Sequence, residues 1–238
     1  MDELNIMVES GLNLGIEINS RDIEKFLKYK RILKQYNKKV NITAITNDIE
    51  IIIKHFIDSL SCFLIEDFFD RCSVIDVGSG GGFPGIPIKI IKPSLRLTCL
   101  DSSLKRVEFL KKVVEELNLD DVNVIHGRAE EVAHEKLYRE MYDKVVARAV
   151  AHLRILVEYC IPFLKTGGSF ICLKGPGAYK EMEESDRAIR LLGGIIDKKK
   201  EFQLPYLNEK RVLIVIKKIK ECPEKYPRRP GLPSKKPL

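Results

Sequence analysis

The sequence has no uninterrupted apolar run of about 18 residues, the length that a membrane-spanning helix requires, so we expect no membrane partner. Its first residues, MDELNIMVES, are acidic and lack the basic start and apolar core of a signal peptide. The six cysteines include no C-x-x-C pair. These absences predict a cytoplasmic protein with reduced core thiols rather than a disulfide framework.

Patterns typical of metal sites and acid–base sites are missing as well. The four histidines, at positions 55, 126, 134 and 152, show no metal-ligand spacing, and no acid–base pair stands out. We therefore predict that the protein binds no metal. His55 is expected to be structural, with contact to a substrate as the alternative.

The formal net charge of +7 is concentrated in two parts of the chain. Residues 197–238 contain 13 Lys or Arg against 5 Asp or Glu, and residues 21–39 contain eight basic and two acidic residues. Clustered basic charge predicts a polyanionic partner, although a solvated surface is the alternative.

Residues 1–65 are predicted to form a helical N-terminal region. A helix that begins with Ser20 as its N-cap repeats apolar residues near the 3.6-residue period. A polar loop at 41–47 precedes a second helix at 48–65. The last segment, 223–238, is basic and proline-rich, so it is expected to be a tail without helix or central strand.

Residues 66–222 alternate between strand and helix patterns. Strands are predicted at 73–77, 95–100, 123–126, 144–147, 169–174, 200–204 and 211–218. Helices are predicted at 86–91, 103–118, 153–164 and 180–192, and residues 127–131 are predicted to begin another helix. Five βα units with short connections give an α/β fold with a doubly wound, mostly parallel sheet. The two late strands lack a crossover helix, which indicates an antiparallel hairpin at one edge of this Rossmann-like, seven-stranded sheet.

The central motif is Ser73–Pro87, SVIDVGSGGGFPGIP, which predicts a strand, a glycine loop and a helix. Gly80, Gly82 and Gly85 fit the dinucleotide fingerprint G-x-G-x-x-G, which is weak alone and contains Pro84 here. Asp76, Gly78, Gly80 and Gly82 fit a second register that is typical of enzymes binding S-adenosylmethionine. We therefore favour S-adenosylmethionine over NAD.

Side chains at the ends of the next two strands support this interpretation. Asp101 closes strand two, about 20 residues beyond the loop, where a carboxylate can accept ribose hydroxyls. Ala129 and Glu130 follow strand three and could contact the adenine edge. Taken singly, Asp76 could merely cap the turn and Asp101 the next helix, but together they follow the carboxyl ends of strands in order, where such sheets bind ligands.

Several further motifs, spread along the whole chain, resemble one family. They are Tyr36-Asn37-x-x-Val40-Asn41-Ile42-Thr43, His55-x-x-Asp58-Ser59-Leu60, Asp76-Val77-Gly78-Ser79-Gly80 to Pro84-Gly85-Ile86-Pro87, Leu100-Asp101-Ser102-x-x-Lys105-Arg106, Arg128-Ala129-Glu130, Ala147-Arg148-Ala149-Val150, Leu173-Lys174-Gly175 and Tyr226-Pro227-Arg228-Arg229-x-Gly231-x-Pro233. This set resembles the RsmG family of bacterial 16S ribosomal RNA guanine-N7 methyltransferases, also called glucose-inhibited division protein B.

The resemblance implies methyl transfer from S-adenosylmethionine to N7 of a guanine in small-subunit RNA, at position 527 by family resemblance. It places cofactor contacts on Gly78, Phe83, Ala129, Glu130 and Arg148, with Asp101 and Ser102 in the ribose-side motif. N7 carries no proton, so no general base is expected. S-adenosylhomocysteine would be the product.

Arg148 is the catalytic candidate: it should face the cofactor carboxylate or the guanine edge, and a salt bridge to Glu130 or Asp101 is the alternative. Phe83 is a candidate stacking platform for a base. Phosphate contacts are predicted for five basic residues, namely Lys28, Lys34, Lys174, Arg228 and Arg229.

The partner would be 16S ribosomal RNA or the small ribosomal subunit, bound by a monomer. A small-molecule methyltransferase and a non-catalytic RNA-binding protein are the alternatives.

Overall fold

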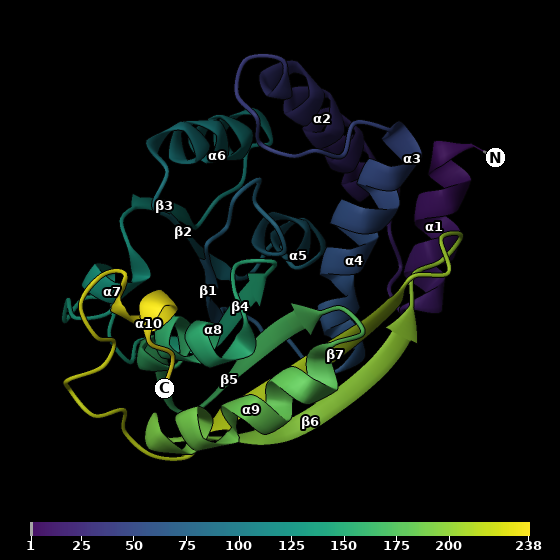
Figure 1. Ribbon diagram of the computed structural model, residues 1–238. Helices are drawn as coiled ribbons and strands as arrows, with labels where there is room; N and C mark the ends of the chain where they lie inside the picture. The colour runs from purple at the N-terminus through teal and green to yellow at the C-terminus, as the bar shows by residue number, and fades with distance from the viewer. Residues whose placement is uncertain (1) are drawn as a thin grey trace.

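A seven-stranded sheet in the order β3-β2-β1-β4-β5-β7-β6 runs through the computed structural model, which describes residues 2–238 (Figure 1). The strands are β1 (Ser73–Val77), β2 (Arg96–Asp101), β3 (Val122–His126), β4 (Tyr142–Arg148), β5 (Leu164–Lys174), β6 (Gly194–Gln203) and β7 (Lys210–Lys218). The first five are parallel, and β7 is antiparallel to both β5 and β6. This topology confirms the predicted doubly wound sheet with an antiparallel edge hairpin.

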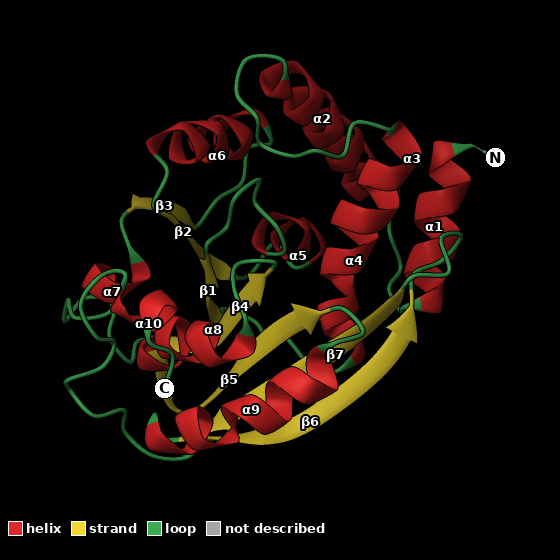
Figure 2. Ribbon diagram, viewed as in Figure 1, coloured by secondary structure: helices red, strands yellow, loops and turns green. Residues whose placement is uncertain are grey.

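Helices cover both faces of the sheet, as Figure 2 shows. One face packs against α1 (Glu3–Asn13), α2 (Ser20–Asn37), α5 (Gly85–Ile91), α6 (Leu104–Glu116) and the continuous segment α3 (Asp48–Glu50), η1 (Ile51–Ile57), α4 (Asp58–Leu60) and η2 (Ser61–Leu64). The other face packs against α7 (Ala129–Val132), α8 (Leu153–Cys160), η3 (Ile161–Phe163) and α9 (Ala178–Leu191). The N-terminal helices thus share one hydrophobic core with the sheet.

Alternation along the strands explains how one sheet serves two cores. Val74 of β1 belongs to the core beneath α5, and the next residue, Ile75, belongs to the core beneath α8. All five residues of β1 are buried. A strand covered on both faces is apolar at successive positions because neither set of side chains meets water.

Some predicted boundaries are wrong. The N-cap of α2 is Asn19 and not Ser20, because the Asn19 side chain accepts from the Arg21 and Asp22 amides. The predicted helix at 48–65 contains a π-helical stretch, Ile51–Ile57, and ends as a 3-10 turn at Leu64. The predicted helix at 153–164 ends its α-helical part at Cys160, and β5 begins at Leu164 rather than at 169.

The last segment of the chain is folded against the sheet domain. It contains the short helix α10 (Leu232–Lys235), so the prediction of no helix in 223–238 is wrong. Tyr226 and Pro233 are buried, and α10 lies beside α8 (Figure 1). Across residues 2–238, none of the helices is both long and apolar enough to cross a bilayer.

Candidate cofactor and acceptor site

The glycine loop between β1 and α5 is held from below by Asp76. Its Oδ2 atom accepts a hydrogen bond from Ser79 Oγ at 2.7 Å and from the Gly85 amide at 2.9 Å, so one carboxylate joins both ends of the loop. The side chain is fully buried, and burial raises its pKa to about 6 despite these two bonds. Oδ1 is buried without a hydrogen-bond partner among the described residues. Asp76 therefore shapes the loop from beneath.

The helix α2 supports the same loop from the other side. The Tyr29 hydroxyl donates to the Gly81 carbonyl oxygen, and the Tyr29 ring is fully buried. Gly82 has φ +90°, and a Cβ atom there would overlap that hydroxyl and contact Ile86. Glycine is thus required at position 82 by both backbone conformation and space.

A cavity of about 150 Å³ opens beside the loop, at the carboxyl ends of β1, β2 and β3. Its walls are formed by Val77, Gly78, Leu100, Asp101, Ser102, Gly127, Arg128, Ala129, Glu130, Val150 and Tyr159. Five predicted cofactor residues, Gly78, Asp101, Ser102, Ala129 and Glu130, are brought together in this wall. Asp76, Gly80, Gly82, Phe83 and Arg148 are not part of it.

Asp101 connects the cavity wall to the glycine loop. Its Oδ2 accepts from the Gly80 amide at 2.8 Å, and its Oδ1 accepts from the Ser103 amide at 2.9 Å, at the start of α6. The residue is 3% exposed. The same carboxylate therefore holds the loop and the amide of Ser103, which is the N-cap of α6 in place of Asp101, and it lines the cavity wall.

The chemistry of this wall fits a nucleoside better than a pyrophosphate. Asp101 and Glu130 supply carboxylates that accept from hydroxyl and amino groups, and Leu100, Val150 and Tyr159 supply apolar contacts. Carboxylates would repel a pyrophosphate. The residues present therefore fit S-adenosylmethionine, whose ribose and adenine offer hydroxyl and amino donors.

Phe83 lies under the site and not on its surface. Its ring stacks on the His55 ring with centroids 4.4 Å apart and on Tyr29 with centroids 5.5 Å apart, and it is 6% exposed. This corrects the expectation of an open platform for a base, because the core occupies its faces. Phe83 contributes packing that fixes the loop.

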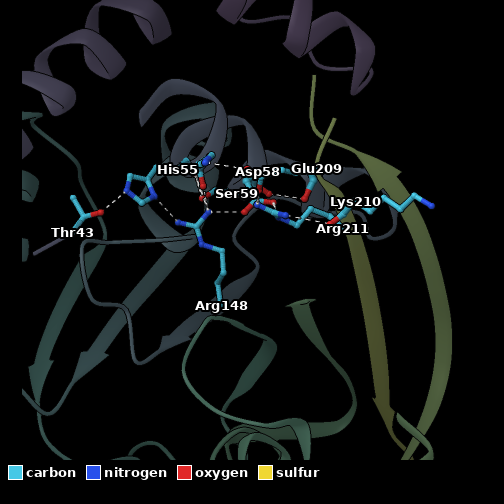
Figure 3. A network of polar contacts seen from close by, with 10 residues as sticks. Thr43, His55, Asp58, Ser59, Arg148, Glu209, Lys210 and Arg211 are labelled. Atoms are coloured by element: carbon cyan, nitrogen blue, oxygen red, sulfur yellow. Dashed lines mark hydrogen bonds and ion pairs between the residues drawn. The ribbon is translucent and has the colours of Figure 1, made fainter. Parts of the chain in front are cut away.

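Arg148, at the end of β4, is bound to the π-helical stretch (Figure 3). Its Nη1 donates to the Lys54 carbonyl at 2.8 Å and lies 3.1 Å from Asp58 Oδ2, and Nη2 lies 3.3 Å from His55 Nδ1. The alternative role predicted for Arg148, a salt bridge to Glu130 or Asp101, is wrong in its partner, which is Asp58. The motif His55-x-x-Asp58 contained this residue, but its spacing alone did not reveal the partner in β4.

His55 is a neutral ring within this network, as expected of a structural histidine. Nδ1 faces the Arg148 guanidinium, so it accepts, and Nε2 donates to Thr43 Oγ1 at 2.9 Å. Burial, and next the Arg148 charge, lower the pKa of His55 to about 3.

A second cavity of about 370 Å³ lies at the carboxyl ends of β4 and β5. It is lined by Ile45, Lys54, His55, Asp58, Arg148, Ala149, Leu173, Lys174, Gly175 and Arg211. Figure 3 shows Arg211 and Glu209 next to Asp58 in the same network. The sequence did not single out Lys54, Asp58 and Arg211 as site residues, because they come from the helical segment before β1 and from the edge hairpin, outside the βα units.

The predicted phosphate-binding residues have different surroundings. Lys174 Nζ contacts the Ala151 carbonyl at 2.6 Å and Glu181 at 2.8 Å, so it holds the loop after β4. Arg228 forms a two-pronged pair with Glu158, which corrects its expected role as a free phosphate contact. Lys28 pairs with Glu116 and Lys34 with Asp48, both at the surface, while Arg229 is exposed.

Within residues 2–238, no group of three His, Cys, Asp or Glu side chains is arranged to hold a metal ion. The six cysteines are buried and free, as expected of core thiols.

Comparison with known proteins decides the family. A family model described as GidB, rRNA small subunit methyltransferase G, matches residues 22–220. The chain belongs to the GidB family. The ribosomal RNA small subunit methyltransferase G of Alkaliphilus metalliredigens (strain QYMF) is 51% identical over 238 residues, covering 100% of both chains. The protein of the same name from Acetivibrio thermocellus is 50% identical and covers 98% of this chain and 96% of its own.

A solved structure shares the GidB fold at low sequence identity. M. jannaschii TYW2 in complex with AdoMet superposes with a TM-score of 0.50 and 14% identity, over 63% of this chain and 71% of that chain. The predicted family, methyltransferase class, Rossmann-like fold and S-adenosylmethionine cofactor are thereby confirmed.

Proposed function

We propose that this GidB-family protein transfers the methyl group of S-adenosylmethionine to N7 of one guanine in 16S ribosomal RNA, position 527 by family resemblance. One observation carries the proposal. The adjacent residues Ala149 and Val150, in the loop after β4, line different cavities: Val150 the one beside the glycine loop and Ala149 the one beside Arg148. A cofactor in the first cavity and a base in the second would both border the loop after β4.

On the cofactor side, the chain supplies acceptors and close backbone approach. Asp101 and Glu130 line the cavity beside the glycine loop. Gly78 lines it too, and a Cβ atom at this position would lie only 2.8 Å from the Val150 side chain. Bound there, S-adenosylmethionine supplies an electrophilic methyl group on a sulfonium. The rigid loop, fixed by Asp76, Asp101 and Tyr29, gives the alignment on which a direct displacement depends.

On the acceptor side, the second cavity suits the Hoogsteen edge of guanine. Guanidinium groups bind O6 of guanine, and Arg148 and Arg211 both line the cavity. As the N7 lone pair forms its bond to the methyl carbon, the carbon–sulfur bond breaks and positive charge moves to the base. Asp58 lies in the same wall, and its negative carboxylate stabilises that positive charge. No proton is transferred, so no general base is needed.

The basic surface supports an RNA substrate over a small molecule. Residues 21–39 carry eight basic and two acidic side chains, of which Lys28 and Lys34 are partly exposed on α2. A small-molecule methyltransferase gains nothing from such clusters, whereas phosphate contacts position an RNA. We further propose that the protein acts as a cytoplasmic monomer on this RNA or on the small subunit.

The test uses purified protein, S-adenosylmethionine with a labelled methyl group, and small-subunit RNA and particles from cells that lack the modification. The labelled methyl group should enter one guanine. N7 methylation makes the RNA backbone cleavable by aniline after reduction, so the RNA should be cleaved at that guanine. Arg148→Lys keeps the charge but not the planar fork, and it should lower the rate at saturating cofactor at least tenfold. Binding of cofactor without label in either substrate would overturn the RNA assignment.

A further inference from the structure

The C-terminal segment 226–234, here called the strap, is hydrogen-bonded to two helices that contribute to the wall of the cofactor cavity. It lies beside α7 and α8, which carry three of the cavity's wall residues, Ala129, Glu130 and Tyr159 (Figure 1). Sequence reasoning assigned this segment to RNA. Its contacts within the protein point elsewhere.

The strongest of these contacts joins Arg228 to Glu158 of α8. Arg228 donates from its backbone amide and from Nε to Glu158 Oε1, both at 2.8 Å, and from Nη2 to Oε2 at 2.7 Å. The Glu158 side chain is fully buried. Three hydrogen bonds on one buried carboxylate fix the strap in position, because releasing them would leave that charge without a partner.

Three residues further along, at Gly231, the strap reaches the cavity wall itself. The Gly231 amide donates to Glu130 Oε1 at 3.0 Å, and Glu130 is 6% exposed. Next to Glu158 in α8 stands Tyr159, whose ring forms another part of the wall. Burial and the carboxylates of Glu130 and Glu158 raise the pKa of Tyr159 to about 12, so its hydroxyl keeps its proton.

The end of the strap near Tyr226 is tied to the segment after α7. His134 Nε2 lies 2.7 Å from the Pro227 carbonyl oxygen, to which it donates. Arg139 Nη1 donates to the Tyr226 carbonyl at 2.8 Å. The strap is therefore held near Tyr226, at Arg228 and at Gly231, by α7, by α8 and by the segment that follows α7.

We propose that the strap is a positioning element of the cofactor site, in which Arg228, through Glu158, keeps the Gly231 amide against Glu130. Glu130 can then present its second oxygen to the nucleoside in a fixed orientation. The proposal rests on the location of the cofactor given above and assigns Arg228 to cofactor binding instead of RNA binding. The neighbouring Arg229 is exposed, which provides a control one residue away.

The experiment measures binding of S-adenosylhomocysteine by calorimetry and binding of small-subunit RNA by filter retention, for Arg228→Lys, Arg228→Ala and Arg229→Ala. Arg228→Lys keeps a cation beside Glu158, so it should fold. We expect its cofactor affinity to fall about threefold to tenfold and that of Arg228→Ala at least tenfold. The KM for S-adenosylmethionine should rise in both while kcat and RNA affinity stay within twofold. Arg229→Ala should leave cofactor affinity unchanged.

Thermal unfolding of each variant identifies a temperature at which all are folded, and the affinities are compared there. Unchanged cofactor affinity in folded Arg228→Lys and Arg228→Ala would overturn the proposal. So would a loss of RNA affinity alone, which would return Arg228 to phosphate binding. If the unaltered protein bound no S-adenosylhomocysteine, the proposed function would fail instead, so the two failures are distinguishable.

Discussion

Arg148 Nη1 and Asp58 Oδ2 lie 3.1 Å apart, and this pair joins the end of β4 to a helical residue 90 positions earlier in the chain. Both side chains are almost completely buried, with 11% and 5% of their areas exposed. A buried pair of this kind holds a cation at a chosen place in the acceptor cavity. Its geometry leads to the first prediction.

Asp58→Asn should destabilise the protein by about 3 kcal/mol, because the Arg148 guanidinium would lose its buried counter-charge. Methyl transfer should fall more than cofactor binding does, since Asp58 lies in the acceptor cavity alone. Urea unfolding measures stability, calorimetry measures cofactor binding, and incorporation of the labelled methyl group into RNA measures methyl transfer. Glu50→Gln removes an exposed partner of Lys54 and should cost less than about 1 kcal/mol.

The stability of the protein should fall in mild acid because of His55. The pKa of His55 is about 3 in the folded protein, whereas that of an unfolded histidine is 6.5. Between these values only the unfolded chain binds the proton, so lowering the pH from 7 to 5 should cost about 2 kcal/mol at this residue. His55→Gln should lose less stability over that range than the unaltered protein.

Urea unfolding at pH 7 and pH 5 gives the comparison, since carboxyl groups such as Asp76 titrate in both proteins and cancel. Equal losses in the two proteins would mean that the ring is not held neutral.

Two glycines of the same loop should respond differently to a methyl group. Gly80 has φ +60° and free space, so Gly80→Ala should cost about 1 kcal/mol for conformation alone. Gly82→Ala should cost clearly more, because its Cβ would also overlap the Tyr29 hydroxyl. Chemical denaturation measures both.

The partner substitution Tyr29→Phe tests the cause. It removes the hydroxyl, so Gly82→Ala should cost less in that background, whereas the cost of Gly80→Ala should not change. An equal cost of Gly82→Ala in both backgrounds would show that the hydroxyl is not the obstacle.

RNA affinity should fall steeply with salt if the basic face of α2 binds phosphate. Lys28→Gln and Lys34→Gln should each reduce the slope of log affinity against log salt by about 1. Titrations at several salt concentrations supply the slopes. Arg190→Gln, on exposed α9 across the sheet, should leave the slope unchanged, and a uniform response of all three would mean a non-specific charge effect.

The sequence predicted the parallel part of the sheet well because both faces are covered. Strands such as β1 are buried along their whole length and carry apolar residues on both faces, the glycine loop follows β1, and Asp101 ends β2. Since carboxyl ends of parallel strands meet at one edge, Gly78, Asp101 and Ala129 could be placed together without coordinates.

Edge and long-range features could not be predicted in this way. The strand β6 begins at Gly194, six residues before the predicted start at 200, and its charged residues 197–201 are exposed. The start of β6 is set by its pairing with β7, and hydrophobic alternation along the strand does not reveal it. Likewise, Arg228 and Glu158 lie 70 residues apart, and a basic, proline-rich segment gives no sign that one of its cations is held by a buried acid.

The bond from Tyr29 to the Gly81 carbonyl makes α2 part of the cofactor loop's energetics, although α2 contributes no atom to the cavity wall. Ligand binding stabilises whatever must be folded for the site to exist. Amide hydrogens in the middle of α2 should therefore exchange with solvent more slowly when S-adenosylhomocysteine is bound. The N-terminal helices, proposed above to bind RNA, would then be most stable when the methyl donor is in place.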